Sequence, residues 1–440
     1  MTLLLDQPAG TATPRFRAFG PRQIDDIAQR YGLDPSLRDG ISLLAKVLPF
    51  RTNQYVLDEL IDWSRPETDP MFRLIFPQRG MLAAEDERTL ATLVRTGAAA
   101  PEIAAVVHRI RAGLNPHPSG QREYNVPVHR GERLPGLQHK YRETVLYFPT
   151  QGQSCHSYCT YCFRWAQFVG DPALRFAAPD PHQLVDYLRA HREVSDVLVT
   201  GGDPMVMSTE RLRGHLEPLL DVDTVDTIRI GTKSLAYWPH RYVTDPDADE
   251  LLRLFERVVA AGKQVAVMAH FTHPRELRTP VVDTALRRIR ATGAVVYCQA
   301  PMVAHVNDQA DTWTQLWRAE LAAGAVPYYM FVERDTGPYD YFKVPLARAV
   351  EIFHAAYRVL PGLARTVRGP VMSTTPGKVI VDGVESRADG RYFVLRMVQA
   401  RNPALVGRPF RAYYDTSAAW LSELELAPEV PQDIRQAVRP

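Results

Sequence analysis

Cysteine is scarce in this chain, with four residues in 440, and no basic segment followed by an apolar core opens it. Both features argue against the disulfide framework of a secreted protein. No apolar run reaches the roughly 20 residues that a membrane helix needs. A net charge of +2 gives no strong positive field for a nucleic acid partner. These absences predict a cytoplasmic protein in reducing surroundings, with neither a membrane nor a nucleic acid as partner.

From residue 144 onward, short apolar runs alternate with longer amphipathic stretches. Alternation of this kind indicates βαβ units and a parallel sheet. Six runs suit a partial (β/α)6 barrel that is open on one side, which places the chain in the α/β class. The predicted strands are 144–148, 196–200, 227–230, 264–268, 294–298 and 326–331.

The domain organisation follows from these patterns. Residues 1–20 are expected to form a loose tail, and residues 21–115 a helical N-terminal region with apolar residues at helical spacing. The barrel is expected to span residues 116–345. Residues 346–440 are expected to form a C-terminal region that begins with a long helix.

Three of the four cysteines fall in one loop, as Cys155-His-Ser-Tyr-Cys159-Thr-Tyr-Cys162. Three thiolates so close can hold three irons of a 4Fe–4S cluster and leave the fourth iron open. Zinc is the alternative, but a structural zinc ion usually takes four ligands, and His156 is wedged between two of the cysteines. Cys298 lies in an apolar run, which is typical of a buried small side chain.

The cysteine spacing resembles that of the radical SAM superfamily. In that superfamily the open iron binds S-adenosylmethionine, and one electron from the cluster releases a deoxyadenosyl radical. Gly201, Gly202 and Asp203 directly follow the second predicted strand, where the superfamily has the loop that receives the methionine amino group. A plain βα turn is the simpler interpretation of the same residues.

Other polar side chains end the next three predicted strands. Thr232, His270 and Gln299 come after the third, fourth and fifth strands, and Lys233 follows Thr232. Because barrel enzymes place their chemistry at the carboxyl ends of the strands, we expect these residues to lie around the cofactor.

A closer resemblance covers roughly residues 65–385, which are similar to the lysine 2,3-aminomutase family of radical SAM enzymes. It rests on many motifs in the same order, not on one of them. Besides the cysteine loop and Gly201-Gly-Asp203, the matching segments are Asp69-Pro-Met, Ile228-Arg-Ile-Gly-Thr-Lys, Pro239-His-Arg241, His270-Phe-Thr-His-Pro274, Val306-Asn-Asp308, Pro327-Tyr-Tyr329 and Pro376-Gly-Lys378.

The resemblance implies pyridoxal 5'-phosphate as a second cofactor. Lys378 matches the lysine that binds the cofactor aldehyde, and its Pro-Gly surroundings predict a turn in which the lysine can swing. Lys140 matches the first basic residue that holds the cofactor phosphate. The second basic position carries Thr144, for which Arg142 is the candidate substitute. Taken alone, Lys378 would be interpreted as a solvated surface lysine.

Two arginines are the candidates for binding the substrate. Arg164 matches the family arginine that pairs with the substrate α-carboxylate, a role that suits a planar guanidinium. Arg334 aligns with an aspartate that meets the lysine ammonium, and Val371 aligns with a second such aspartate. A side-chain carboxylate as in glutamate or aspartate is therefore predicted, unless the neighbouring Asp335 is the true match, and arginine stays among the candidate substrates.

The sequence thus predicts an isomerase that moves an amino group from the α-carbon to the β-carbon. Its expected cofactors are a 4Fe–4S cluster, S-adenosylmethionine and pyridoxal phosphate. Its expected partners are an amino acid substrate, a reducing electron donor and further copies of the chain in a homo-oligomer. A different radical reaction on an amino acid and a non-catalytic iron–sulfur protein are the alternatives.

Overall fold

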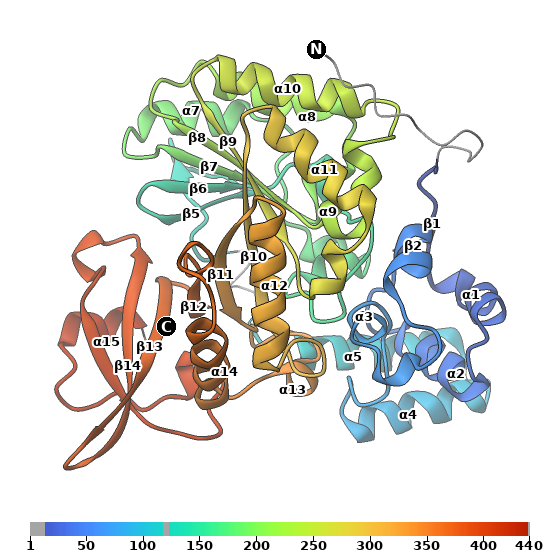
Figure 1. Cartoon of the computed structure of the whole chain (residues 1–440). Helices are drawn as coiled ribbons and strands as arrows, with labels where there is room; N and C mark the ends of the chain where they lie inside the picture. The colour runs from blue at the N-terminus through green and yellow to red at the C-terminus, as the bar shows by residue number, and fades with distance from the viewer. Residues whose placement is uncertain (1–13, 118–122, 439–440) are drawn as a thin grey trace.

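A single sheet of eleven strands runs through the computed structural model, which describes residues 14–117 and 123–438 (Figure 1). Seven neighbouring strands, β6 to β12, are parallel and follow one another in chain order. Their bounds are β6 Thr144–Tyr147, β7 Asp196–Val199, β8 Thr227–Thr232, β9 Gln264–His270, β10 Val295–Met302, β11 Val326–Val332 and β12 Arg368–Ser373.

The six strands predicted from the apolar runs are confirmed, and with them the α/β class. The sheet also continues past residue 345, because β12 pairs in parallel with β11. The sequence pattern of β12, Arg368-Gly-Pro-Val-Met-Ser373, carries too few apolar residues to be recognised as a barrel strand.

Helices connect the parallel strands and pack on the outside of the sheet (Figure 1). In α10, Leu251, Leu254, Phe255 and Val258 recur every three or four residues and are buried, so the helix covers the barrel with one apolar face. The crossover helices are α7 His182–Ala190, α8 Thr209–Leu216, α9 Ser234–Tyr237, α10 Ala248–Ala260, α11 Pro280–Ala291, α12 Ala310–Ala322, α13 Tyr339–Phe342 and α14 Leu346–Arg358.

Strand β10 shows how the sheet separates its two faces. Val296, Cys298, Ala300 and Met302 are buried, whereas the alternate residues, including Gln299, keep partial exposure. Since side chains alternate between the faces of a strand, one face packs under the helices and the other faces an open interior. Cys298 is therefore a core residue, as predicted, and lies on the opposite face from Gln299.

The sheet curls until its edge strand β5, Leu137–Tyr141, contacts β12 and the strand that follows β12. Strand β5 pairs antiparallel with β6 at one edge. Its Lys140 Nζ donates to Ser373 Oγ of β12 at 3.1 Å. Lys378 Nζ, on the strand after β12, lies 4.7 Å from the ring centre of Tyr141. These contacts close the interior of the barrel across its open side.

An N-terminal region of helices lies beside the barrel (Figure 1). Its helices are α1 Ile24–Tyr31, α2 Pro35–Leu44, α3 Pro70–Ile75, α4 Ala84–Arg95 and α5 Ala100–Leu114, with strand β2 at Thr52–Asn53. Residues 1–13 of the predicted loose tail lie outside the described residues. Its last part is not loose, because Ala18–Phe19 forms strand β1 and pairs with β2.

The N-terminal region also supports the cysteine loop. Asn53 Nδ2 donates to the carbonyl oxygens of His156, at 3.1 Å, and Tyr237, at 3.0 Å. Thr160 Oγ1 donates to the carbonyl oxygen of Arg73 at 2.8 Å. Backbone and side-chain groups of the loop thus find partners more than 80 residues away, which fixes the loop against the N-terminal region.

The C-terminal region extends the sheet with antiparallel strands. Its elements are β13 Gly377–Arg387, β14 Gly390–Ala400, β15 Pro409–Tyr413 and α15 Gln432–Val438. Strands β13 and β14 are 11 residues long each. A separate small hairpin, β3 Val128–His129 with β4 Glu132–Arg133, precedes β5.

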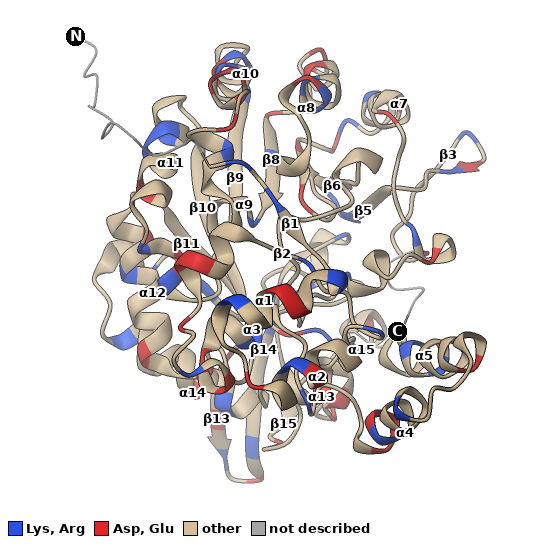
Figure 2. Ribbon diagram, turned by 90° about the vertical axis from the view of Figure 1, so that its right-hand side faces the viewer, with Lys and Arg blue, Asp and Glu red and all other residues tan. Residues whose placement is uncertain are grey.

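Acidic and basic residues are interspersed over the helices, for example in α4, α8 and α10 (Figure 2). Across the described residues, no helix is both long enough and apolar enough to cross a membrane.

Candidate functional site

The three clustered cysteines follow β6 at the carboxyl end of the barrel, and all three are free thiols with partial exposure. The charges of Cys159 and Cys162 act on the pKa of Cys155, so the three thiols lie near one another. Three thiols leave a tetrahedral zinc ion one ligand short, whereas a 4Fe–4S cluster can take three and leave one iron open.

Without a metal, these thiols hold their protons. Burial raises the pKa of Cys162 to about 12 and the pKa of Cys155 well above its usual value. Neighbouring thiolates raise both further, whereas the Arg164 guanidinium opposes the shift. Because thiols must lose their protons to bind a metal, metal binding at this site is coupled to proton release.

The glycine loop packs directly on the cysteine loop. A Cβ on Gly202 would lie 2.5 to 2.7 Å from backbone atoms of Ser154, and one on Gly201 would lie 2.9 Å from the Gly152 oxygen. Asp203 N also donates to the Gly152 oxygen at 3.0 Å. The two glycines are needed here because two backbone segments touch, a reason that the sequence alone did not give.

The carboxylate of Asp203 is occupied by donors from the protein. It accepts from Thr232 Oγ1 at 2.7 Å, from Lys233 N at 2.9 Å and from Met205 N at 2.9 Å. Burial raises its pKa to about 6, although these hydrogen bonds counteract the rise. Asp203 therefore ties the glycine loop to the end of β8, which positions the backbone of the loop.

Lys233, His270 and Gln299 lie at the same rim. Lys233 Nζ pairs with the buried Glu276 at 2.7 Å and donates to the His270 oxygen at 3.2 Å. Tyr161, from the cysteine loop, holds His270 Nε2 at 2.8 Å. Burial, and secondarily the charge of Lys233, lowers the pKa of His270 well below its usual value. The neutral imidazole is thus linked to the cysteine loop.

Gln299 faces the interior next to His270, its partner in the register of β9 and β10. Its amide has no partner in the part of the chain that the structure describes, so it is available to a ligand.

Lys378 does not lie in a mobile turn. It is the second residue of β13 and only 7% exposed, and its Nζ donates to Gln399 Oε1 at 2.8 Å. Burial lowers its pKa to about 7, with further lowering by Arg229 and Arg368. The prediction that Lys378 lies in a turn or at the surface is therefore wrong. Pairing of β13 with β14 places the residue inside the barrel.

A lysine amine with a pKa near 7 is partly deprotonated at neutral pH. Such an amine can attack an aldehyde. The structure thus gives Lys378 the chemical property that a cofactor-binding lysine needs.

A set of cations surrounds Lys378. Burial lowers the pKa of Lys140 well below its usual value, and the charges of Arg334 and Lys378 lower it further. Arg229 pairs with Asp196 at 3.1 Å, and its buried Nε has no partner among the described residues. The barrel interior thus holds several basic side chains, which suit ligands that carry phosphate and carboxylate groups.

Thr144, which stands at the second basic position, and Arg142, its candidate substitute, have other partners in the structure. Thr144 Oγ1 donates to Asp196 Oδ2 at 2.9 Å. Arg142, the predicted substitute, pairs with Glu143 at 3.2 Å, and its side chain is 52% exposed. It is exposed because it lies in the turn between β5 and β6, outside both strands.

Arg164 follows Cys162 in a segment without regular strand structure, and its side chain is buried. Its guanidinium carbon lies 4.4 Å above the Phe148 ring, and Nη2 donates to Gln153 at 3.2 Å. Its Nε is buried and has no hydrogen-bond partner in the described part of the chain. Burial lowers its pKa to about 10, so it stays charged. An unsatisfied buried guanidinium beside the cysteines is a fitting site for a carboxylate.

Arg334 and Asp335 interact, since the charge of Asp335 opposes the lowering of the pKa of Arg334 by burial, but their other partners differ. Arg334 lies near Lys140 and Tyr141, since their charges affect one another's pKa, and its guanidinium carbon is 5.5 Å from the Phe163 ring centre. Asp335 pairs with His117 of the N-terminal region at 3.3 Å. Val371 is fully buried beside Tyr329 and Ile380. Of the two candidates it is Arg334 that lies near the cations around Lys378.

Several residues of this interior escaped the sequence analysis. They are Ser373, Gln399, Asp196, Arg229, Arg368 and Glu333. A charged residue within a buried strand, as in Ile228-Arg229-Ile230, is a signal that could have found one of them. Ser373 and Gln399 gave no such signal, because their neighbourhood depends on the pairing of β12, β13 and β14.

Comparisons with known proteins place this chain in a family. It is 31% identical over 374 residues to a protein of Aquifex aeolicus that carries a provisional L-lysine 2,3-aminomutase name, and the match covers 85% of this chain and 87% of that one. The chain belongs to the lysine 2,3-aminomutase family. As an aminomutase homologue it shares the radical SAM character of that family, and the predicted resemblance is confirmed.

Two further aminomutases show how far the likeness extends. The L-lysine 2,3-aminomutase of Bacillus subtilis is 26% identical over 276 residues, which cover 59% of this chain and 56% of that enzyme. The L-lysine 2,3-aminomutase of Fusobacterium nucleatum is 26% identical over 230 residues, or 51% of each chain. The match thus spans about half the length of these two aminomutases. No family model matches the chain.

The aminomutase fold was also compared with solved structures. SuiB of Streptococcus suis aligns at a TM-score of 0.35 and 11% identity, covering 61% of this chain and 56% of that one. The radical S-adenosylmethionine methyltransferase TsrM of Kitasatospora setae aligns at 0.31 and 16%, covering 53% and 46%. The order and direction of the strands define the fold of this chain.

Proposed function

We propose that this chain is an amino acid 2,3-aminomutase that uses a 4Fe–4S cluster, S-adenosylmethionine and pyridoxal phosphate. One observation supports it above others: the barrel holds three free thiols at its rim and a buried lysine with a pKa of about 7 in its interior. When bound, the cluster and S-adenosylmethionine supply a primary radical, and pyridoxal phosphate supplies conjugation for nitrogen migration. A reducing donor and a homo-oligomer remain predictions.

The residues of the chain would then have separate tasks. Cys155, Cys159 and Cys162 would hold the cluster, and the backbone of Gly201-Gly-Asp203 with Gln299 would face the cosubstrate. Lys378 would hold the aldehyde carbon, and Lys140 with Ser373 would bind the phosphate. Because orientation accounts for most of what a protein adds to such cofactors, burial of these groups excludes water and fixes the reacting atoms.

The substrate proposed is an amino acid with a carboxylate side chain, glutamate or aspartate. Arg164, with its unsatisfied Nε, would bind the α-carboxylate. Arg334 lies near Lys140, whereas Asp335 pairs with His117, so the interior offers a guanidinium where a lysine-specific enzyme offers a carboxylate. Burial raises the pKa of Glu333 well above its usual value, which weakens this carboxyl group as a counter-charge for Arg334.

A substrate comparison tests this proposal. Purified chain, reconstituted with iron, sulfide and pyridoxal phosphate, is supplied with S-adenosylmethionine and a reductant and assayed with glutamate, aspartate, arginine and lysine. We expect a β-amino acid from an acidic substrate, and Arg334→Gln to lower that turnover roughly tenfold or more. Asp335→Asn is the matched control and should leave it unchanged.

Turnover of lysine alone would rule out the acidic substrate while leaving the aminomutase proposal intact. If Arg334 instead binds the cofactor phosphate, Arg334→Gln would weaken pyridoxal phosphate binding without changing the order of substrates. Absence of any cluster or of any cosubstrate cleavage would reject the aminomutase proposal itself.

A further inference from the structure

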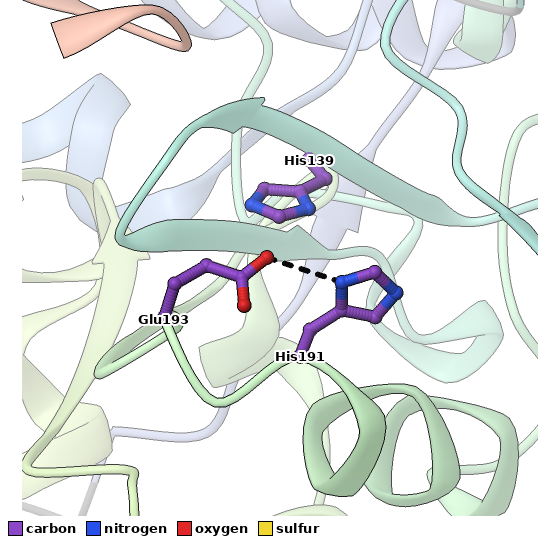
Figure 3. Close-up of side chains that lie close together, drawn as sticks. All are labelled: His139, His191 and Glu193. Atoms are coloured by element: carbon purple, nitrogen blue, oxygen red, sulfur yellow. Dashed lines mark hydrogen bonds and ion pairs between the residues drawn. The ribbon is translucent and has the colours of Figure 1, made fainter.

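A second group of ligand-type side chains lies beside the strand pair β5–β6, away from the cations of the interior (Figure 3). It consists of His139 of β5 with His191 and Glu193, which follow α7. One ring nitrogen from each histidine and one carboxylate oxygen all lie within 4.8 Å of one another. Neither the sequence motifs nor the proposed reaction uses these three residues.

The distances within the group approach those around a bound ion. His191 Nδ1 and Glu193 Oε1 are 3.1 Å apart. Two ligands of a tetrahedral zinc ion, with bonds of about 2.0 to 2.1 Å, are separated by about 3.4 Å. His139 offers the third ligand atom, which lies within 4.8 Å of the other two. The side chains of His191 and Glu193 are 33% and 34% exposed, which leaves room for water as a further ligand.

The contacts of His139 also suit a metal ligand. One ring nitrogen, Nδ1, lies 2.7 Å from the Tyr187 hydroxyl, and the other, Nε2, lies 3.1 Å from the Arg142 carbonyl oxygen. A metal ion replaces one of these contacts, and the remaining nitrogen keeps a hydrogen bond. Metal-bound histidines usually have this second partner, which fixes the ring orientation.

The position of His139 in the strand connects this group with the barrel interior. The register of β5 with β6 shifts between Gln138 and Tyr141, so His139 and Lys140 form an irregular segment of the strand. Bulges of this kind redirect side chains. Here they turn Lys140 toward Ser373 and His139 toward the group outside. An ion on His139 would fix the segment that carries Lys140.

We propose that His139, His191 and Glu193 form a binding site for one divalent transition metal ion of the zinc class. Two imidazoles and one carboxylate are a ligand set typical of zinc with an open position. The ion would join β5 to the loop between α7 and β7. The inference does not depend on the aminomutase proposal, because it concerns residues outside the barrel interior.

Zinc binding by the full chain tests this site. Because free cysteine thiols also bind zinc, the three cysteines must first be occupied by the cluster or replaced. The measurement is equilibrium dialysis with elemental analysis, on chain with a reconstituted cluster and on a Cys155→Ser, Cys159→Ser, Cys162→Ser variant. We expect one zinc ion per chain in both. His191→Ala and Glu193→Gln should each weaken binding roughly tenfold or more. His108→Ala, at an exposed helical histidine, is the matched control and should have no effect.

Cobalt supplies a second measurement that reports the ligand type. Bound Co²⁺ should give visible bands without the near-ultraviolet bands of thiolate ligands. The proposal is wrong if the His191→Ala, Glu193→Gln double variant binds zinc as tightly as the unaltered chain. It is also wrong if neither the cluster-reconstituted chain nor the triple cysteine variant retains zinc. The three residues then form a hydrogen-bonded cluster only.

Discussion

The ammonium of Lys378 donates to the side-chain oxygen of Gln399 at 2.8 Å, and the two residues face each other in the register of β13 and β14. Strand pairing therefore brings the lysine into the barrel and holds it there without an ionised partner. A hydrogen bond to a neutral amide does not restore the solvation that burial removes, so the lowered pKa of Lys378 follows from its place in the sheet.

The pKa of about 7 predicts how cofactor attachment depends on pH. Since the pKa is lowered, Lys378 loses its proton near pH 7 and gains nucleophilicity as the pH rises. The rate at which pyridoxal phosphate develops its lysine-bound visible absorption should climb from about pH 6 to pH 8 and then level off. Lys378→Arg should give no such band. A rate that rises only near pH 10 would show an ordinary, solvated lysine.

Arg164 should determine the affinity for the substrate carboxylate. Lysine at this position keeps the charge but loses the planar pair of donors. We expect Arg164→Lys to raise KM by roughly tenfold to a hundredfold, as for a hydrogen bond to a charged group. Steady-state kinetics on the reconstituted enzyme measure this effect. Arg142→Lys, at the exposed arginine, is the control, and an equal KM in the two variants would contradict the assignment.

Gly202 should tolerate no side chain. Its Cβ would lie within 2.7 Å of the Ser154 backbone, so Gly202→Ala must displace the cysteine loop at a cost of about 1 to 3 kcal/mol. We expect a lower melting temperature and less iron retained after reconstitution. Gly214→Ala is the matched control, because nothing lies within 4 Å of a Cβ there. Equal iron content in both variants would show that the close approach is unimportant.

The ion pair of Lys233 and Glu276 should contribute to folding as a unit. Their side chains are 9% and 0% exposed, so Lys233→Met would leave a buried carboxylate without its cation. The free energy of unfolding should fall by about 3 to 5 kcal/mol, as measured by denaturant titration. Lys343→Met, which breaks an exposed pair with Asp340, should cost less than about 1 kcal/mol. Similar losses in the two variants would refute this account.

The predicted strands and cysteine loop were accessible from sequence because they depend on local patterns. Apolar runs such as Asp196-Val-Leu-Val-Thr200 identify strands by their composition, and Cys155, Cys159 and Cys162 lie within eight residues. The buried Cys298 followed from the same reasoning. The burial of Lys378 and the exposure of Arg142 could not be predicted in this way. A single residue shows no periodicity, and its exposure depends on elements that are distant in the sequence.

The sequence by itself determined the α/β class, the order of the parallel strands and the residues around the three thiols. Those features arise from side-chain alternation and close spacing, which neighbouring residues encode. Only the tertiary structure decided that Lys378 is buried, that Arg334 lies near Lys140, and that His139 meets His191 and Glu193. These relationships join segments up to about 240 residues apart, and the curling of one sheet, not any local preference, sets their geometry.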